Sequence, residues 1–222
     1  WRMDFDDMDR KLKENQIHAA VFCSPHNPCG RVWERWELEQ AMEIYRNNDV
    51  MVISDEIWSD LTLEGYQHIP LQSVSEDARM RTVALYAPSK TFNLAGMQFS
   101  NIIIPNKEYQ KQWTDVVSNR LSVGMCSPFG LTAIIAAYTE GEEWLDQAIA
   151  YVSDNKAYLD QFLRERIPQI RMIPSEGTYL VWLDCSQLPY RGMALEHFMI
   201  NEAKVAFCAG YEFGKQGEAF LR

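Results

Sequence analysis

Short runs of apolar residues punctuate the first half of the chain. Runs this short and this apolar are typical of strands buried in a parallel sheet. Residues 36–46, between the first two runs, place apolar side chains at helical intervals, so strand, helix and strand form one βαβ unit. The pattern therefore predicts the α/β class, with a mostly parallel sheet flanked by helices. The runs are residues 21–23, 50–53, 82–86 and 99–105.

Helical periodicity dominates the middle of the chain. We expect helices over residues 107–120, 128–138 and 142–164, and the last of these is long and amphipathic. Its apolar face should pack on the rest of the protein. The core candidates of this helix are Trp144, Ile149, Val152, Leu159 and Phe162.

The remainder of the chain changes character. A strand over residues 178–183, a helix over 194–203 and a short strand over 205–207 indicate a smaller α+β unit. We therefore expect part of a large domain over residues 1–140 and part of a small C-terminal domain over residues 141–222.

Three predicted strands are each followed by a polar residue of a different kind. Lys90, Asp55 and Asn27 come at or just after the carboxyl ends of three different apolar runs. Ligands bind at this edge of an open α/β sheet, so we expect the three side chains in one site. Considered alone, Lys90 also fits a solvated surface lysine. Together, an amine for an aldehyde, a carboxylate for a ring nitrogen and a donor for a ring oxygen suit pyridoxal phosphate.

The segments around these residues resemble a known family. Residues 24–33, 54–57 and 87–96 read SPHNPCGRVW, SDEI and APSKTFNLAG. In this order and spacing they resemble the pyridoxal phosphate enzymes of aminotransferase fold type I, and more narrowly the MalY/PatB branch of cystathionine β-lyases. The resemblance runs over essentially the whole chain. Because that family is longer at both ends, we interpret the chain as a fragment truncated at both ends.

The resemblance implies a reaction. The expected activity is carbon–sulfur β-lysis, in which cystathionine or a related cysteine S-conjugate is cleaved by α,β-elimination to pyruvate, ammonia and a thiol. A class I/II aminotransferase is the first alternative, because the residues alone do not decide between the two outcomes. An inactive fragment or a regulatory binding module of the same fold is the second. It stays open because the family's phosphate loop and ring-stacking aromatic come from an earlier segment that is absent here.

The resemblance also assigns roles to individual residues. Lys90 is expected to hold the cofactor as a Schiff base and, once freed, to move the substrate α-proton. Asp55 is expected to pair with the pyridine nitrogen, and Asn27 to bind the ring oxygen and the substrate. Ser89 is a candidate ligand of the phosphate group. Trp58 completes the cofactor set, at a position where many relatives carry a tyrosine.

Other assignments have plain alternatives. Arg222 falls where the family places the arginine that binds the α-carboxylate of an amino-acid substrate in a fork, and a frayed terminal arginine is its alternative. Asp55 also fits a strand-end carboxylate, and Asn27 a turn residue before proline. Gln98 stands where many aminotransferases carry a phosphate-binding arginine, so this stretch matches the β-lyase branch better.

Composition and charge narrow the expected partners. The net charge of −10 argues against nucleic acid, because phosphate binding needs clustered Lys and Arg. No apolar run approaches the ~20 residues of a membrane span, and we expect a cytoplasmic protein without a membrane partner. The five cysteines and four histidines lack metal-ligand spacing, so we predict no metal and reduced thiols. Cys29 is expected to be structural, since no partner base is evident. The resemblance to the family also implies that the protein forms a homodimer.

Overall fold

The larger sheet contains four strands in sequence order, β1 (Ala19–Cys23), β2 (Met51–Asp55), β3 (Thr82–Tyr86) and β4 (Asn101–Ile103). The computed structural model describes residues 1–222. In it, β1, β2 and β3 run parallel, whereas β4 pairs antiparallel with β3. The register aligns Cys23 with Asp55 and Asp55 with Leu85, so the carboxyl ends of the parallel strands lie level. The predicted mostly parallel sheet is confirmed.

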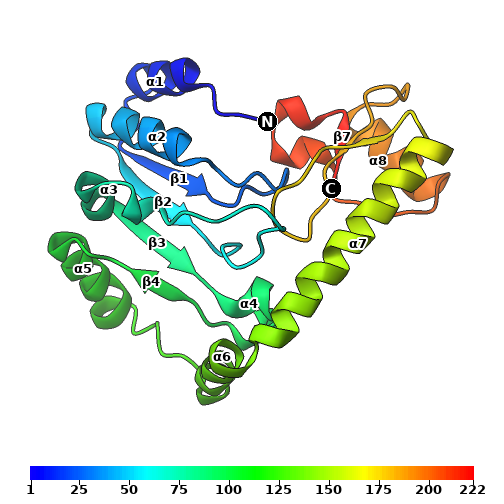
Figure 1. Cartoon of the computed structure of the whole chain (residues 1–222). Helices are drawn as coiled ribbons and strands as arrows, with labels where there is room; N and C mark the ends of the chain where they lie inside the picture. Colours follow the sequence, from blue (N-terminus) through cyan, green and yellow to red (C-terminus); the bar gives the residue numbers. More distant parts are fainter.

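Helices cover one face of this sheet. They are α1 (Phe5–Glu14), α2 (Arg35–Asn47) and α3 (Glu76–Arg81), and Figure 1 shows α1 and α2 in blue beside β1. The apolar stripe of α2 packs on the inward side chains of the strands, and both Leu38 and Val52 are fully buried. Burial of this kind stabilises the fold by roughly 25 cal/mol for each Å² of apolar surface removed from water.

The opposite face of the sheet is more accessible. Val21 is 72% exposed, and its register partner Ile53 is only partly buried. Side chains alternate between the two faces of a strand, so Asp55 lies on the same side as Ile53. This face therefore presents a carboxylate at the carboxyl edge of the sheet.

The next four helices come after β3, namely α4 (Pro88–Thr91), α5 (Lys107–Thr114), α6 (Pro128–Glu140) and α7 (Glu142–Arg166). The three predicted helices of this region are confirmed, and the first continues as the π-helical segment η3 (Asp115–Arg120). Figure 1 shows α7 as a long diagonal rod that runs from beside α4 and α6 to the C-terminal part of the chain. Short 3₁₀ turns lie at Leu71–Ser73, Ala95–Met97, Gly210–Phe213 and Lys215–Gly217.

The buried face of α7 differs from the predicted one. Trp144 is 52% exposed and Phe162 is 41% exposed, so these two core candidates are wrong. The buried positions of α7 are Leu163 and Lys156. The periodicity located the helix, but two large aromatic residues lie on its outer side.

A second, smaller sheet forms from the C-terminal third. Its strands are β5 (Arg171–Met172), β6 (Leu183–Asp184) and β7 (Phe220–Leu221), all antiparallel. The helix α8 (Gly192–Asn201) packs on it through Leu195, in a second apolar cluster that includes Leu163 of α7. The predicted helix over 194–203 is therefore confirmed within two residues at each end.

Two predicted strands are wrong. Residues 205–207 form no strand, and of residues 178–183 only the last is in one. Thr178 has a φ of +62°, which lies in the left-handed region and is incompatible with a continuous strand. Hydrogen bonds from outside the segment hold this conformation, so local β propensity does not decide it.

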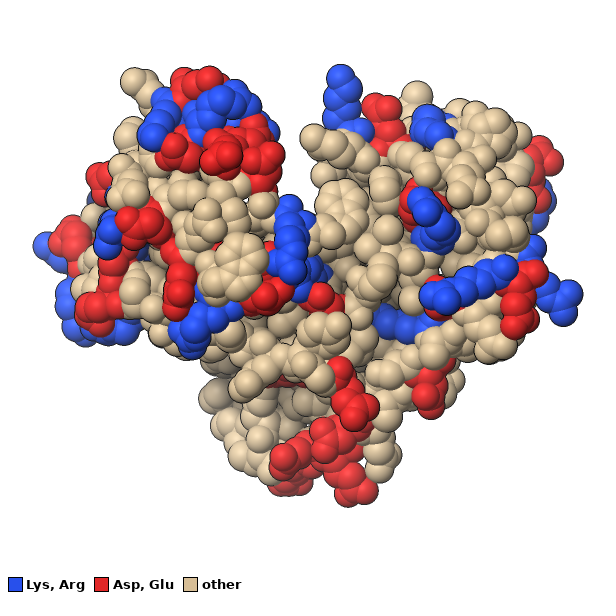
Figure 2. All heavy atoms as spheres, turned by 45° about the horizontal axis from the view of Figure 1, so that its top comes forward, with Lys and Arg blue, Asp and Glu red and all other residues tan.

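Charged side chains are spread over the surface. Figure 2 shows Lys and Arg mixed with Asp and Glu over one face of the molecule, with an acidic concentration at its lower tip and no continuous basic patch. Several of the charges pair within one helix, as in the four ion pairs of α1. None of the helices is both long and apolar enough to cross a bilayer.

Candidate active site

Lys90 lies at the carboxyl edge of the larger sheet. β3 ends at Tyr86, and Pro88 begins the short helix α4, where its fixed φ favours the first helical turn. Lys90 is partly buried, and neither a hydrogen bond nor an ion pair engages its Nζ. That nitrogen lies 5.8 Å from the ring centroid of Trp58, within the range of a cation–π contact. The amine is thus held against an aromatic face but remains chemically free.

Asp55 is the last residue of β2 and lies level with the end of β3. Its Oδ1 accepts a hydrogen bond of 3.3 Å from the backbone N–H of Ile57, and the carboxylate makes no ion pair. The register places Asp55 between Cys23 of β1 and Leu85 of β3. The strand ends therefore bring Asp55, Asn27 and Lys90 to one edge, although no hydrogen bond joins these three side chains.

Asn27 and Arg222 meet despite lying 195 positions apart in the chain. Arg222 Nη1 donates to Asn27 Oδ1 at 3.1 Å, and Nη2 lies 3.0 Å from Cys208 Sγ. The guanidinium also lies over the Phe213 ring, 4.9 Å from its centroid. Paired backbone hydrogen bonds of 3.0 Å with Cys208 fix the last residue, so a frayed terminal arginine is not what the structure shows.

Gly30 closes the turn that carries Asn27. Its φ of +69° lies in the left-handed region, and an added Cβ would lie 2.2 Å from Ser175 Oγ and 2.7 Å from the carbonyl oxygen of Gly177. The Gly30 carbonyl accepts hydrogen bonds of 2.9 Å from the backbone N–H groups of Glu176 and Gly177. Glycine is needed here both for its conformation and for this close approach.

Replacing Gly30 by alanine should lower the free energy of unfolding by about 2 to 5 kcal/mol, because a left-handed φ and an overpacked contact add together. Gly65→Ala is the matched control. Gly65 also has a positive φ, +85°, but open space surrounds its missing Cβ, so only about 1 kcal/mol should be lost there. Urea unfolding followed by circular dichroism measures both losses. Equal losses in the two variants would show that the contact with residues 175–177 contributes nothing.

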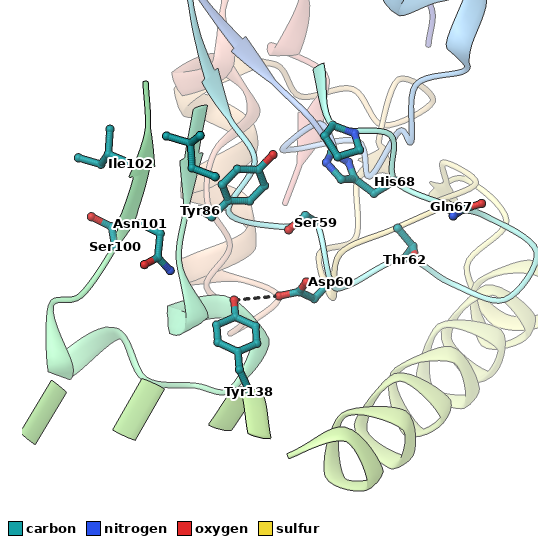
Figure 3. Close-up of a pocket in the computed structure, with 12 residues that line it drawn as sticks. Ser59, Asp60, Thr62, Gln67, His68, Tyr86, Ser100, Asn101, Ile102 and Tyr138 are labelled. Carbon is teal, nitrogen blue, oxygen red and sulfur yellow. Dashed lines mark hydrogen bonds between the residues drawn. The ribbon is translucent and has the colours of Figure 1, made fainter. Parts of the chain in front are cut away.

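A cavity of about 860 Å³ adjoins the site without containing it. Figure 3 shows residues of β4 and of the loop after β2 on opposite sides of this cavity, with Tyr138 of α6 pointing at Asp60. Asp60 Oδ2 accepts hydrogen bonds from Thr91 Oγ1 at 2.8 Å and from the Tyr138 hydroxyl at 3.2 Å. Burial and the nearby Asp60 charge raise the pKa of Tyr138, which therefore stays protonated as a donor. These bonds anchor the helix that carries Lys90.

Cys29 has a partner base that the sequence did not reveal. His26 Nδ1 lies 3.1 Å from Cys29 Sγ. However, burial raises the pKa of the Cys29 thiol and lowers the pKa of His26, so both groups favour their neutral forms. A neutral thiol is a weak nucleophile, and the structural interpretation of Cys29 stands.

The residues present fit the pyridoxal phosphate that the resemblance implies. Lys90 offers an unengaged amine and Asp55 an unpaired carboxylate. The Oδ1 of Asn27 accepts from Arg222, so its Nδ2 is the atom left to donate to a ring oxygen. Ser89 is partly buried beside Lys90, and its hydroxyl has no partner within the chain. Together these groups can hold an aldehyde-bearing ring with a basic nitrogen. No group of three or more His, Cys, Asp or Glu side chains has the geometry of a metal site.

Three residues close to the site escaped the sequence analysis. Asp60 accepts a hydrogen bond from Thr91 of α4, the Tyr179 ring packs edge-on against the Trp58 ring with centroids 4.8 Å apart, and Lys156 is buried on α7. Tyr179 falls within the strand predicted over residues 178–183, and that pattern gave no reason to place it at the site. Of these three residues, only Lys156 is marked by the sequence pattern, because a lysine interrupts the apolar stripe of α7 four residues after Val152.

The chain is similar to known proteins along its entire length. A family model for aminotransferase class I and II matches residues 1–222. Over 222 residues the chain is 38% identical to cystathionine beta-lyase PatB of Bacillus subtilis (strain 168), covering 100% of this chain and 57% of that protein. It is 33% identical to Protein MalY of Escherichia coli (strain K12), covering 100% of this chain and 56% of that protein.

Solved structures agree with this similarity. The crystal structure of cystalysin from Treponema denticola, which contains a pyridoxal 5'-phosphate cofactor, matches with a TM-score of 0.94 and 39% identity. The match covers 99% of this chain and 56% of that chain. The fold is therefore that of the expected family, and the chain spans just over half the length of the relatives it matches.

Proposed function

The chain belongs to the aminotransferase class I and II family, and from this membership we propose that it forms the Lys90-bearing part of a pyridoxal-phosphate-dependent carbon–sulfur β-lyase. The substrate is cystathionine or a related cysteine S-conjugate, and the products are pyruvate, ammonia and a thiol. The observation that supports this most is the level register of β1, β2 and β3, which gathers an amine, a carboxylate and an amide at one edge.

Each of these groups has one task. Pyridoxal phosphate, when bound, supplies an aldehyde and a cationic ring that stabilises negative charge on the substrate α-carbon. Lys90 would hold it through the amine, and Asp55 would keep the ring nitrogen protonated, because a nearby carboxylate raises the pKa of a basic nitrogen. Asn27 Nδ2 would donate to the ring oxygen and Ser89 would bind the phosphate, while the face of Trp58 orients the Lys90 side chain.

Lys90 also moves the proton. Once substrate has taken its place, Nζ is a free amine that can accept the α-proton as a general base. The ring of Trp58, which is 4% exposed, shields one side of this amine from water. In β-lysis, a thiolate is then expelled from the β-carbon. In transamination no thiolate leaves, and the proton returns to another carbon.

Arg222 is placed to recognise the substrate carboxylate. Contacts with Asn27, Cys208 and the Phe213 ring hold its guanidinium in one orientation. A planar fork binds a carboxylate through two parallel hydrogen bonds, which a lysine cannot reproduce. Arg222 would thereby link substrate binding to Asn27, the residue that would donate to the ring oxygen.

Replacing Arg222 by lysine should raise KM about 10- to 100-fold with a smaller change in kcat, because charge-assisted hydrogen bonds contribute about 1.5 to 3 kcal/mol. Steady-state kinetics of pyruvate release measures both constants. Arg164→Lys is the control, since Arg164 is exposed on α7 and pairs only with Asp160. An unchanged KM in Arg222→Lys would remove Arg222 from the substrate site.

A class I/II aminotransferase is the alternative, favoured by the name of the family itself. The two activities are separated by supplying the protein with cystathionine, or with alanine and a keto acid. Release of pyruvate, ammonia and thiol from cystathionine supports the lyase. Amino transfer from alanine, without thiol release from cystathionine, supports the aminotransferase.

The architecture suggests how the protein is organised. We place the boundary between a large and a small domain at the start of α7, so that residues 1–140 and 141–222 belong to different domains. We also propose a homodimer in the cytoplasm, where five unpaired cysteines would stay reduced. The exposed apolar side chains of α6, among them Phe129 at 80% and Ile135 at 55% exposure, offer an interface for a second copy.

A further inference from the structure

Lys156 is a buried cation without a buried anion. It lies on the inner side of α7 and is only 6% exposed. Its Nζ donates hydrogen bonds to Ser175 Oγ at 2.8 Å, to the Gly177 carbonyl at 3.3 Å and to the Thr178 carbonyl at 2.6 Å. Burying an ammonium group is costly unless its donors are satisfied, and these three acceptors match its three N–H groups. Burial lowers the pKa of Lys156 to about 8.

All three acceptors belong to one short stretch, residues 175–179, which we call the bridging segment. Thr178 in this segment has a φ of +62°, an unfavourable conformation for a β-branched residue that persists only where its surroundings hold it. Two hydrogen bonds tie the Thr178 backbone to other segments, one of 2.6 Å from Lys156 Nζ to its carbonyl and one of 2.6 Å from its N–H to the Leu61 carbonyl. Lys156 therefore fixes the backbone at its most strained point.

The bridging segment contacts both loops of the candidate site. Glu176 and Gly177 donate to the carbonyl of Gly30, at the end of the Asn27 turn, and the carboxylate of Glu176 pairs with Arg31. On its other side, Leu63 donates to the Glu176 carbonyl at 2.9 Å, in the loop that follows Trp58. A shift of the segment would therefore move both loops.

Tyr179 carries this connection to Lys90. Its ring packs edge-on against Trp58 with centroids 4.8 Å apart, and the Trp58 ring in turn lies 5.8 Å from Lys90 Nζ. The contacts run without a gap from Lys156 through the bridging segment and the two aromatic rings to the amine. Lys156 Nζ donates only to the bridging segment, so any effect of Lys156 on the site passes through this segment.

We propose that Lys156 is a positioning residue for the Lys90 amine: it holds the bridging segment so that Tyr179 keeps Trp58 against Lys90. This role rests on the proposed function of the Lys90 site. A lysine suits it because three donors converge on carbonyl and hydroxyl oxygens, whereas an apolar side chain of the same length would only fill the space. Purely structural support of α7 is the competing explanation.

The proposal can be tested in the intact chain by two measurements that do not depend on catalytic activity. In Lys156→Met, amide hydrogen exchange at residues 176–178 and at Leu63 should be at least ~10-fold faster, because their hydrogen bonds lose their anchor. The rate at which acetic anhydride acetylates Lys90, read by peptide mapping, should rise at least ~3-fold. Lys156→Gln keeps N–H donors and should fall between wild type and Lys156→Met. Asn155→Met places the same side chain at an exposed neighbouring position and should change neither rate.

Kinetics completes the test. Lys156→Met should lower kcat for thiol release about 10- to 100-fold with less change in KM, because a small misplacement of a reacting group costs this much. Faster exchange with an unchanged Lys90 acetylation rate would overturn the proposal in favour of purely structural support, and so would wild-type values throughout. If the wild-type protein releases no thiol, the proposed function fails, while the Lys90 acetylation rate still decides the positioning role.

Discussion

Lys90→Ala should lose cystathionine cleavage by at least ~10³-fold, the largest effect expected of any single substitution. The variant lacks both the amine that holds the cofactor and the base that takes the α-proton, and general base catalysis alone contributes about 10²- to 10⁴-fold. The fold should survive, because Lys90 Nζ makes no hydrogen bond or ion pair and its interaction with the Trp58 ring is a 5.8 Å cation–π contact. Pyruvate release measures the loss, and thermal unfolding verifies the fold.

Two further variants make this result specific. Lys90→Arg keeps a cation beside Trp58 but offers a guanidinium that stays protonated and does not condense with an aldehyde, so it should be as inactive as Lys90→Ala. Lys111→Ala removes an exposed lysine of α5 and should keep wild-type activity. Retention of more than a tenth of wild-type activity in Lys90→Ala would remove Lys90 from the reaction.

Asp55→Asn should lower kcat/KM about 10²-fold at saturating cofactor. A carboxylate beside a basic ring nitrogen shifts its pKa by about 1 to 3 units, and each unit corresponds to a tenfold change in the population of the charged form. The amide of asparagine keeps the shape of the side chain but not its charge, so the ring would lose its proton and with it most of its ability to withdraw electrons. Steady-state kinetics with cystathionine measures the effect.

Asp49→Asn is the matched control for this charge. Asp49 lies just before the amino end of β2, its side chain is 98% exposed, and it makes only a 3.5 Å contact with Arg81. The same change of charge at the opposite end of the strand should leave kcat/KM within twofold of wild type, since exposed pairs contribute about 0 to 1 kcal/mol. Equal losses in both variants would mean that net charge, rather than the position of Asp55, governs activity.

The three strand-end residues were predictable from sequence because one physical rule locates them. Buried parallel strands are short continuous apolar runs, and parallel strands end at the same edge. Once the runs before Asn27, Asp55 and Lys90 were recognised, their level register followed, and the structure confirms it. The resemblance to a known family then assigned these residues to roles that spacing alone left open.

The surroundings of these residues were not predictable, because tertiary contacts determine them. Residues 178–182 have strand-like composition, yet Thr178 is held in a left-handed conformation because its carbonyl accepts from Lys156 and its N–H donates to the Leu61 carbonyl. His26 lies beside Cys29 because the turn folds back, which spacing does not reveal. Trp144 and Phe162 satisfy the helical period but lie on the outer side of α7. In each case a contact between distant segments overrides the local pattern.

Covalent trapping tests the central claim most directly. The protein is incubated with pyridoxal phosphate, its visible spectrum is recorded, sodium borohydride is added, and the labelled peptide is identified by mass spectrometry. A yellow form that borohydride converts into a stable pyridoxyl group on Lys90 is the predicted result. A label on any other lysine, or a protein that stays colourless and unlabelled, would contradict the assignment of Lys90 as the cofactor lysine.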